Sequence, residues 1–130
     1  MTVDEIQNIL DFAYPKIKEY YGKGKLSFPT ISLHSDIYTR LSGETGMEGE
    51  ESSSKAEYDE TENEIYVYYS NVENEEDLLR SLIHEYTHYL QDISKFKKLY
   101  TQQYTYDTNP YELEARKAEE DWYIFSKENQ

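Results

Sequence analysis

The chain contains no cysteine and no long apolar run, and each absence excludes a class of protein. Without cysteine no disulfide can support the fold, so a bound metal ion has to be held by histidine, aspartate or glutamate. The amino-terminal "MTVDEIQNIL" lacks a basic segment followed by an apolar one, and no stretch of about eighteen apolar residues occurs anywhere. We therefore expect a cytoplasmic protein with no signal peptide and no transmembrane segment.

Positive charge is scarce as well. Thirteen lysines and arginines stand against 27 aspartates and glutamates in 130 residues, which gives a net charge of −14. Such a chain repels nucleic acid phosphates and anionic membrane surfaces, so we expect neither as a partner. The length fits a single domain, residues 1–130, with a modest core of helices around a small sheet. The oligomeric state is left open.

Tyrosine, in contrast, is abundant, with 15 residues against four phenylalanines. Its side chain has β propensity and packs like other aromatic rings, but its hydroxyl needs water or a backbone partner. We therefore expect most tyrosines at half-buried positions around a small core.

A helix is expected at the amino terminus. Thr2 and Glu5 form a capping box, and apolar residues recur behind them at helical spacing as far as about Tyr21. Pro15 should kink or divide this helix, because a proline in a helix interior removes a hydrogen bond and clashes with the preceding turn.

Three segments have the pattern typical of strands. Segment 26–36 alternates after its proline, with His34 on the polar face, and segments 56–59 and 65–69 flank the polar turn "ETEN" as a hairpin. Residues 42–55 are rich in glycine and glutamate and predict a mobile acidic loop. The pattern favours a short, mainly antiparallel sheet.

Two further helices are expected in the second half. Asn74, followed by three acidic residues, marks the start of a helix that runs to about Phe96. Asn109 before Pro110 opens a last helix that runs to about Phe125. Together the elements predict a small α+β domain with an N-terminal helix, a short sheet and two C-terminal helices.

The first of these two helices carries a pattern that points to metal chemistry. His84, Glu85 and His88 form the sequence H-E-x-x-H within "LIHEYTHYLQ". Histidines at i and i+4 project from one helical face, close enough for both imidazoles to bind one ion. The apolar residues of this helix cluster opposite the pair, so the helix can bury its back and present the histidines to a cleft. That arrangement favours a metal site over solvated surface histidines.

Zinc bound by two histidines requires a third protein ligand and leaves a fourth position for water. The last helix offers several glutamates, and its apolar stripe, taken over residues 111–125, indicates which side faces inward. Glu114 lies about 60° from the centre of that stripe, and Glu112 lies about 100° away. We therefore predict Glu114 as the third ligand, with Glu112 as the alternative.

The sequence combines a hairpin, an H-E-x-x-H helix and a later helix with Glu-Ala at 114–115. This combination resembles the gluzincin type of zincin metallopeptidases, as in thermolysin and the compact ImmA/IrrE-like peptidases. The resemblance implies a zinc peptidase whose substrate-side edge is the strand before the metal helix, here 65–69. Thermolysin-like enzymes carry an acidic residue four after the zinc-binding glutamate to orient a histidine, where this chain has Ala118. Three acidic residues are candidates for that role instead: Asp92, Glu119 and Asp121.

The predicted reaction is hydrolysis of a peptide bond in a peptide or protein substrate. Zinc lowers the pKa of its water to about 7, and Glu85, which cannot complete the ligand set, accepts the proton as general base. It then passes the proton to the leaving amine. A second electrophile in this superfamily is commonly a tyrosine or histidine, and three residues are candidates here: His34, Tyr104 and Tyr106.

Two alternatives use the same residues. The first is a zinc-containing binding or interaction protein without catalysis, whose fourth zinc position is closed by a residue such as His34. The second is a non-peptide amide hydrolase. The acidic loop at 42–55 fits each reading, as a cover over the cleft or as a solvated excursion.

Overall fold

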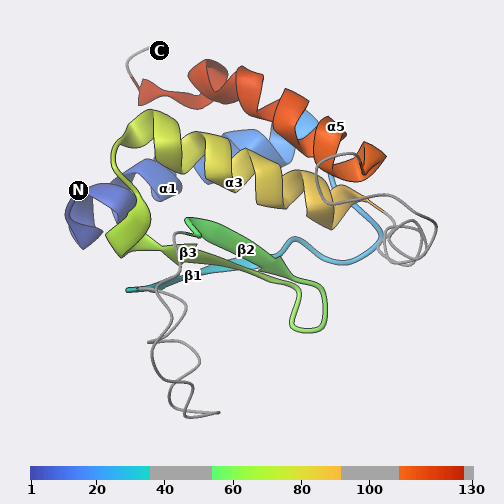
Figure 1. The fold of residues 1–130 in the computed structure, drawn as a ribbon, viewed down its shortest axis with the longest axis horizontal. Helices are drawn as coiled ribbons and strands as arrows, with labels where there is room; N and C mark the ends of the chain where they lie inside the picture. Colours follow the sequence, from blue (N-terminus) through green and yellow to red (C-terminus); the bar gives the residue numbers. More distant parts are fainter. Residues whose placement is uncertain (36–53, 92–108, 128–130) are drawn as a thin grey trace.

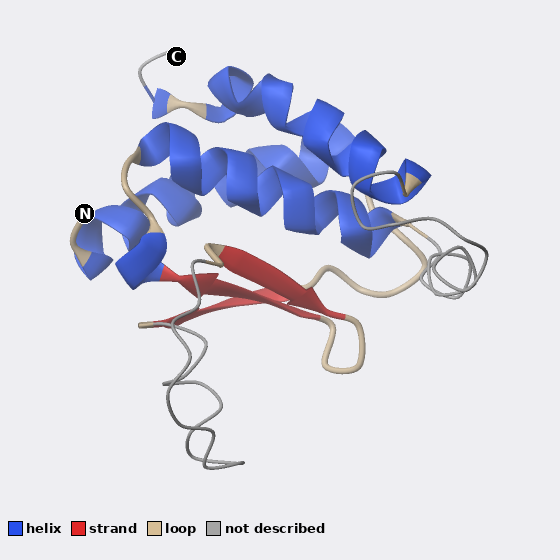
Figure 2. Ribbon diagram, in the orientation of Figure 1, coloured by secondary structure: helices blue, strands red, loops and turns tan. Residues whose placement is uncertain are grey.

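The computed structural model describes residues 1–35, 54–91 and 109–127, so most of the predicted acidic loop lies outside the described residues. Within these ranges the chain forms helices and one sheet, which confirms the predicted α+β class. The helices lie together on one face of the sheet (Figures 1 and 2). None of these helices is long and apolar enough to cross a membrane.

Helix α1 spans Val3–Tyr21 and begins with the predicted capping box. The backbone N–H of Glu5 donates to Oγ1 of Thr2, and the N–H of Thr2 donates to Oε1 of Glu5, both at 3.1 Å. The prediction was that Pro15 kinks or divides the helix; the helix runs through Pro15 without interruption, so the proline does not divide it. Its buried face continues on both sides of the proline, and this packing outweighs the loss of one hydrogen bond.

The described sheet has the order β1-β3-β2, with β1 at Thr30–His34, β2 at Ala56–Asp59 and β3 at Glu64–Tyr68. β2 and β3 pair antiparallel as the predicted hairpin, whereas β1 pairs parallel to β3. The sheet is therefore mixed rather than mainly antiparallel. A short 3-10 helix, η1, follows β3 at Tyr69–Asn71.

The register of β1 explains why it joins β3. Ile31 lies opposite Ile65, and Leu33 lies opposite Val67. The two β3 residues are completely buried, and the two β1 residues pack against the same core. Parallel pairing thus places the apolar face of β1 under the helices and turns His34 to the other face, as its alternation predicts.

Helix α3 spans Glu75–Leu90 and lies in the middle of the molecule (Figure 1). It contacts α1, the helical segments that follow it in the chain, and the strands β2 and β3. It begins as predicted, because Oδ1 of Asn74 accepts the N–H of Asp77 at 2.9 Å. It ends earlier than predicted, since Gln91 already has an extended conformation with ψ 157°. Phe96, the predicted end, lies outside the described residues.

The predicted last helix consists of two different helices. Helix α5 spans Pro110–Ala118 and is capped by Asn109, whose Oδ1 accepts the N–H of Tyr111 at 2.8 Å. A 3-10 helix, η2, follows directly at Glu119–Phe125, and its last residue is buried in the core. The change of helix type alters which side chains face inward, and this decides the composition of the site described below.

Three tyrosines from α1 and α3 hold the connection 22–29 between α1 and β1. Each hydroxyl donates to a backbone carbonyl at 2.5 to 2.6 Å. The pairs are Tyr14 with Pro29, Tyr86 with Gly22, and Tyr89 with Leu26. Their hydroxyls have backbone partners, one of the two kinds of partner expected from sequence, although two of these tyrosines are buried rather than half-buried.

Candidate metal centre

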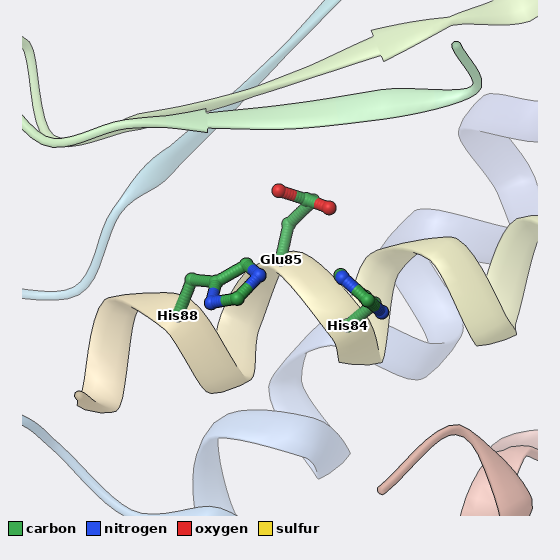
Figure 3. Close-up of side chains that lie close together, drawn as sticks. All are labelled: His84, Glu85 and His88. Carbon is green, nitrogen blue, oxygen red and sulfur yellow. The ribbon is translucent and has the colours of Figure 1, made fainter. Parts of the chain in front are cut away.

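Helix α3 presents two histidines and a glutamate close together. His84 and His88 lie one turn apart, with ring centroids 4.9 Å from each other. Figure 3 shows both imidazoles along the helix, while the carboxylate of Glu85 rises between them toward the strands. One ligand atom from each of these residues lies within 4.8 Å of the others, so the group could hold a metal ion.

A further side chain, Glu112, reaches both histidines from helix α5. Its Oε1 lies 2.5 Å from Nε2 of His88, and its Oε2 lies 3.2 Å from Nε2 of His84. Only 1% of Glu112 is exposed. Burying a carboxylate is costly unless it is paired, and here its partners are two imidazole nitrogens. Two nitrogen donors and one carboxylate therefore lie together between α3 and α5.

Glu114, the third ligand predicted from sequence, does not face the histidines. It is exposed, and its Oε1 accepts a hydrogen bond of 3.2 Å from Nε2 of Gln91. The placement predicted for Glu114 is therefore wrong, and Glu112 takes that position. The prediction assumed a continuous α-helix, whereas the chain tightens at Glu119 into a 3-10 helix with about 120° per residue instead of about 100°. Within α5 itself the buried residues are Glu112 and Ala115.

The remaining ring nitrogens of the histidines have partners of their own. Nδ1 of His84 lies 2.7 Å from Oε2 of Glu119, and Nδ1 of His88 lies 2.7 Å from Oε1 of Gln91. An ionised carboxylate only accepts hydrogen bonds, so Nδ1 of His84 is the donor and its Nε2 is left toward Glu112. Outer hydrogen bonds of this kind fix the ring orientation of metal-binding histidines.

The two histidines have an acidic environment. Burial disfavours the charged form of His84, but its hydrogen bonds to Glu112 and Glu119 outweigh burial and raise its pKa from 6.5 to about 10. The pKa of His88 is raised too, because Glu112 and Glu85 favour protonation more than burial opposes it. The groups around both imidazoles therefore favour a positive charge, which is the sign of charge that a metal ion would bring.

Glu85 faces the sheet rather than α5. Its Oε1 accepts the backbone N–H of Tyr58 in β2 at 2.9 Å. Burial raises the pKa of this carboxyl, and the neighbouring His88 and His84 oppose the rise. A raised pKa brings a carboxylate closer to the range in which it exchanges protons with water near neutral pH.

Strand β2, not β3, borders the site. β3 is paired on both sides, so the predicted role of segment 65–69 as a substrate-side edge is wrong. β2 is one of the two edge strands of the described sheet, and it is the one that lies beside Glu85. The carbonyl of Lys55 accepts the N–H of Tyr68 at 2.9 Å. The antiparallel alternation then turns the N–H and C=O groups of Ala56 and Tyr58 away from β3. The N–H of Tyr58 meets Glu85 of the helix, and the carbonyl of Ala56 accepts the hydroxyl of Ser54 at 3.2 Å.

An open cavity of about 230 Å³ lies between β2 and α3. Its lining consists of Lys55, Ala56, Ser81, His84, Glu85 and Glu119. The ammonium of Lys55 lies 2.5 Å from Oδ1 of Asp77, which anchors the start of β2 to α3. The cavity gives a small molecule or a peptide access to the glutamate and to one histidine of the pair.

No family model, curated protein or solved structure matches this chain. We therefore infer what the site does from its own geometry and chemistry. The resemblance to gluzincins found in the sequence stays a prediction.

The other residues considered from sequence have different partners. On β1, Nε2 of His34 lies 3.2 Å from Oγ of Ser32, and its ring lies 5.5 Å from that of Tyr66, on the sheet face opposite the helices. Asp121 accepts a hydrogen bond of 2.9 Å from the hydroxyl of Tyr21. Three candidates lie outside the described residues: Asp92, Tyr104 and Tyr106. His34 therefore does not close the metal position in this arrangement.

Two residues of the site were misjudged or missed from sequence. Glu112 ranked second, although its spacing of three from the small Ala115 is typical of one buried helix stripe. Gln91 was missed, because a glutamine at the end of a helix is common and does not by itself indicate a metal site. Its position three after His88 is the signal that could have found it, since that spacing brings side chains together at a helix end.

Proposed function

We propose that the protein is a zinc-dependent metallopeptidase with His84, His88 and Glu112 as its zinc ligands. The observation that carries the proposal is the buried carboxylate of Glu112, which lies within 3.2 Å of Nε2 of both histidines. Two histidines and one glutamate form a donor set of catalytic zinc sites, in which the fourth position is left for water or substrate.

The donor set fits zinc in its chemistry as well as its number. Imidazole nitrogen and carboxylate oxygen suit zinc, whereas magnesium and calcium prefer oxygen ligands alone. The hydrogen bonds from Nδ1 of His84 to Glu119 and from Nδ1 of His88 to Gln91 leave both Nε2 atoms for a metal. Burial of Glu112 keeps the carboxylate available for the ion rather than for water.

Glu85 is the general base in this proposal. Bound zinc supplies a Lewis acid that brings the pKa of water to about 7. Because Glu85 directly follows His84, it points away from the ligand face, and the N–H of Tyr58 holds its carboxylate at the cavity. From there Glu85 accepts the proton of the attacking water and delivers it to the leaving amine.

The edge of β2 is suited to an extended peptide. The N–H of Ala56 is turned away from β3, and Ala56 lines the same cavity as His84 and Glu85. An extended chain that pairs with this edge is held by backbone hydrogen bonds, so its binding depends little on its side chains. We therefore propose an unfolded or extended polypeptide as the substrate class, with the scissile carbonyl beside Glu85.

The experiment combines metal analysis with a cleavage assay. Wild-type protein should bind one zinc per chain, and His84→Ala should lose it. Glu85→Gln should keep zinc and the fold, since an amide oxygen can still accept the N–H of Tyr58, but cleavage should fall by a factor of about 10² to 10⁴. The exposed Glu120→Gln serves as the matched control and should retain wild-type activity.

Three outcomes contradict the proposal in different ways. A folded wild type that takes up no zinc would remove the metal site. Zinc binding without cleavage of any member of a broad peptide library would instead favour a zinc-containing binding protein. A Glu85→Gln variant with full activity would exclude Glu85 as the base.

A further inference from the structure

Gln91 contacts both helices that supply ligands to the proposed zinc site, α3 and α5. It is the first residue after helix α3, and its extended backbone turns the side chain back toward the helix. Its Oε1 lies 2.7 Å from Nδ1 of His88. Its Nε2 lies 2.9 Å from the backbone carbonyl of Tyr111, the residue directly before Glu112.

The amide of Gln91 can adopt only one orientation in these surroundings. Its Nε2 donates to the carbonyl of Tyr111 and, at 3.2 Å, to Oε1 of Glu114. Both partners only accept hydrogen bonds, so a flipped amide would set its oxygen against two other oxygens. The helix α5 side therefore fixes the Gln91 oxygen on the imidazole of His88.

The fixed amide decides the tautomer of His88. An amide oxygen only accepts, so Nδ1 of His88 has to carry the proton. In the neutral imidazole that metal binding requires, the lone pair is then on Nε2, the nitrogen that faces Glu112. His84 reaches the same state through the carboxylate of Glu119, whereas His88 depends on an amide that itself needs to be held.

We propose that Gln91 is the positioning residue that keeps His88 in the Nδ1–H tautomer with Nε2 directed at the metal, and that Glu114 holds Gln91 in that orientation. The inference rests on the zinc site proposed above. Glu114 is exposed and is not a ligand, so it affects the metal only indirectly, through Gln91 and then His88. Because Gln91 also bonds the backbone beside Glu112, the same amide sets the spacing between ligands on two different helices.

The test measures zinc affinity in full-length variants by competition with a chromophoric chelator. Gln91→Met keeps the length of the side chain but can neither accept from His88 nor donate to α5, and it should weaken zinc binding about 10- to 100-fold. Glu114→Ala should weaken it about two- to tenfold, because one exposed hydrogen bond is lost. Glu114→Gln should stay near wild type, since its amide oxygen can still accept from Gln91. Glu120→Ala is the control and should change nothing.

A second readout separates positioning from a merely structural effect. Imidazole ¹⁵N spectra of the zinc-loaded wild type should show His88 protonated at Nδ1, with a proton that exchanges slowly with water. In Gln91→Met that proton should exchange faster or the second tautomer should appear. Circular dichroism checks folding, and if Gln91→Met does not fold, the two Glu114 variants carry the test.

The outcomes distinguish this inference from the zinc site itself. Wild-type zinc affinity and an unchanged His88 signal in Gln91→Met would overturn the positioning role while the zinc site stands. A weaker site with an unchanged His88 signal would also overturn it, since Gln91 would then act through the fold alone. A wild type that binds no zinc would remove both.

Discussion

The two faces of helix α3 are stabilised in different ways. One face is apolar and packs against α1 and the sheet. Its completely buried residues are Leu78, Leu79, Leu82, Ile83 and Tyr86. The other face carries His84 and His88, whose contacts with α5 and η2 are hydrogen bonds and ion pairs. The same helix thus joins a packed core to a site in which each polar atom needs a particular partner.

The two faces differ in whether their stabilising interactions depend on the direction of approach. Apolar burial is non-directional and grows with the area removed from water. Hydrogen bonds and metal coordination require an atom of the right kind at a given distance and angle. Substitutions on the packed face should therefore change the free energy of unfolding, and substitutions on the site face should change metal affinity.

The largest effect is expected from Leu82→Ala on the packed face. The side chain is completely buried, so its truncation should lower the free energy of unfolding by about 2 to 5 kcal/mol. Urea unfolding measures the loss. Zinc stoichiometry at a temperature where the variant is still folded should equal that of the wild type. Loss of zinc from a variant of undiminished stability would contradict the separation of the two faces.

On the site face the sharpest comparison is Glu112→Gln against Glu114→Gln. Structural zinc sites with four ligands are worth about 10 to 16 kcal/mol, or about 3 kcal/mol per ligand, so Glu112→Gln should weaken zinc binding about 100-fold or more. Glu114→Gln should remain near wild type. Chelator competition measures both affinities. The reverse order would return the ligand role to Glu114.

The acidic surroundings of the histidines predict a dependence on pH. The pKa of His84 is raised from 6.5 to about 10, so its protonated form stabilises the metal-free fold. That contribution is fully present below about pH 6.5 and is lost as the pH rises toward 10. Chelator-treated protein should therefore become less stable over this range, while apparent zinc affinity should increase because zinc displaces protons. His84→Ala should lose much of the stability trend; an unchanged trend would exclude His84 as its source.

The smallest effect is expected from Tyr89→Phe, where α3 holds the connection 22–29. The hydroxyl of Tyr89 donates to the carbonyl of Leu26 at 2.6 Å and accepts the N–H of Gly24 at 3.0 Å. Its removal should cost about 1 to 2 kcal/mol of unfolding free energy and leave zinc affinity unchanged. Tyr123→Phe, on an exposed tyrosine, is the matched control. Equal stability of the two variants would show that these hydrogen bonds contribute nothing.

The apolar face of α3 and the alignment of its two histidines could be predicted from the sequence because both are local. A helical period places Leu82 inward and aligns His84 with His88 without knowledge of any other element. The capping box at Thr2 and the hairpin around the "ETEN" turn were predictable for the same reason. Each of these patterns is complete within a few turns or strands.

The partners of the site were less predictable because they come from elsewhere in the chain. Glu112 lies 24 residues after His88, and its selection over Glu114 depends on where α5 changes into a 3-10 helix. A helical wheel cannot show that change. The central place of β3 likewise depends on β1, which joins it from 34 residues earlier in the sequence. Local patterns do not determine which of two strands a third one joins.

The tyrosine hydrogen bonds to the connection 22–29 have a consequence for the order of folding. Tyr86 and Gly22 are 64 residues apart, and Tyr89 and Leu26 are 63 apart. β1 also pairs with β3, which is made later. During synthesis, residues 1–35 therefore cannot make these contacts until about fifty further residues have been added. Until then the apolar face of α1 is uncovered. We expect a fragment of residues 1–60 to lack stable structure by circular dichroism; a cooperatively melting fragment would show that this part of the chain folds without α3.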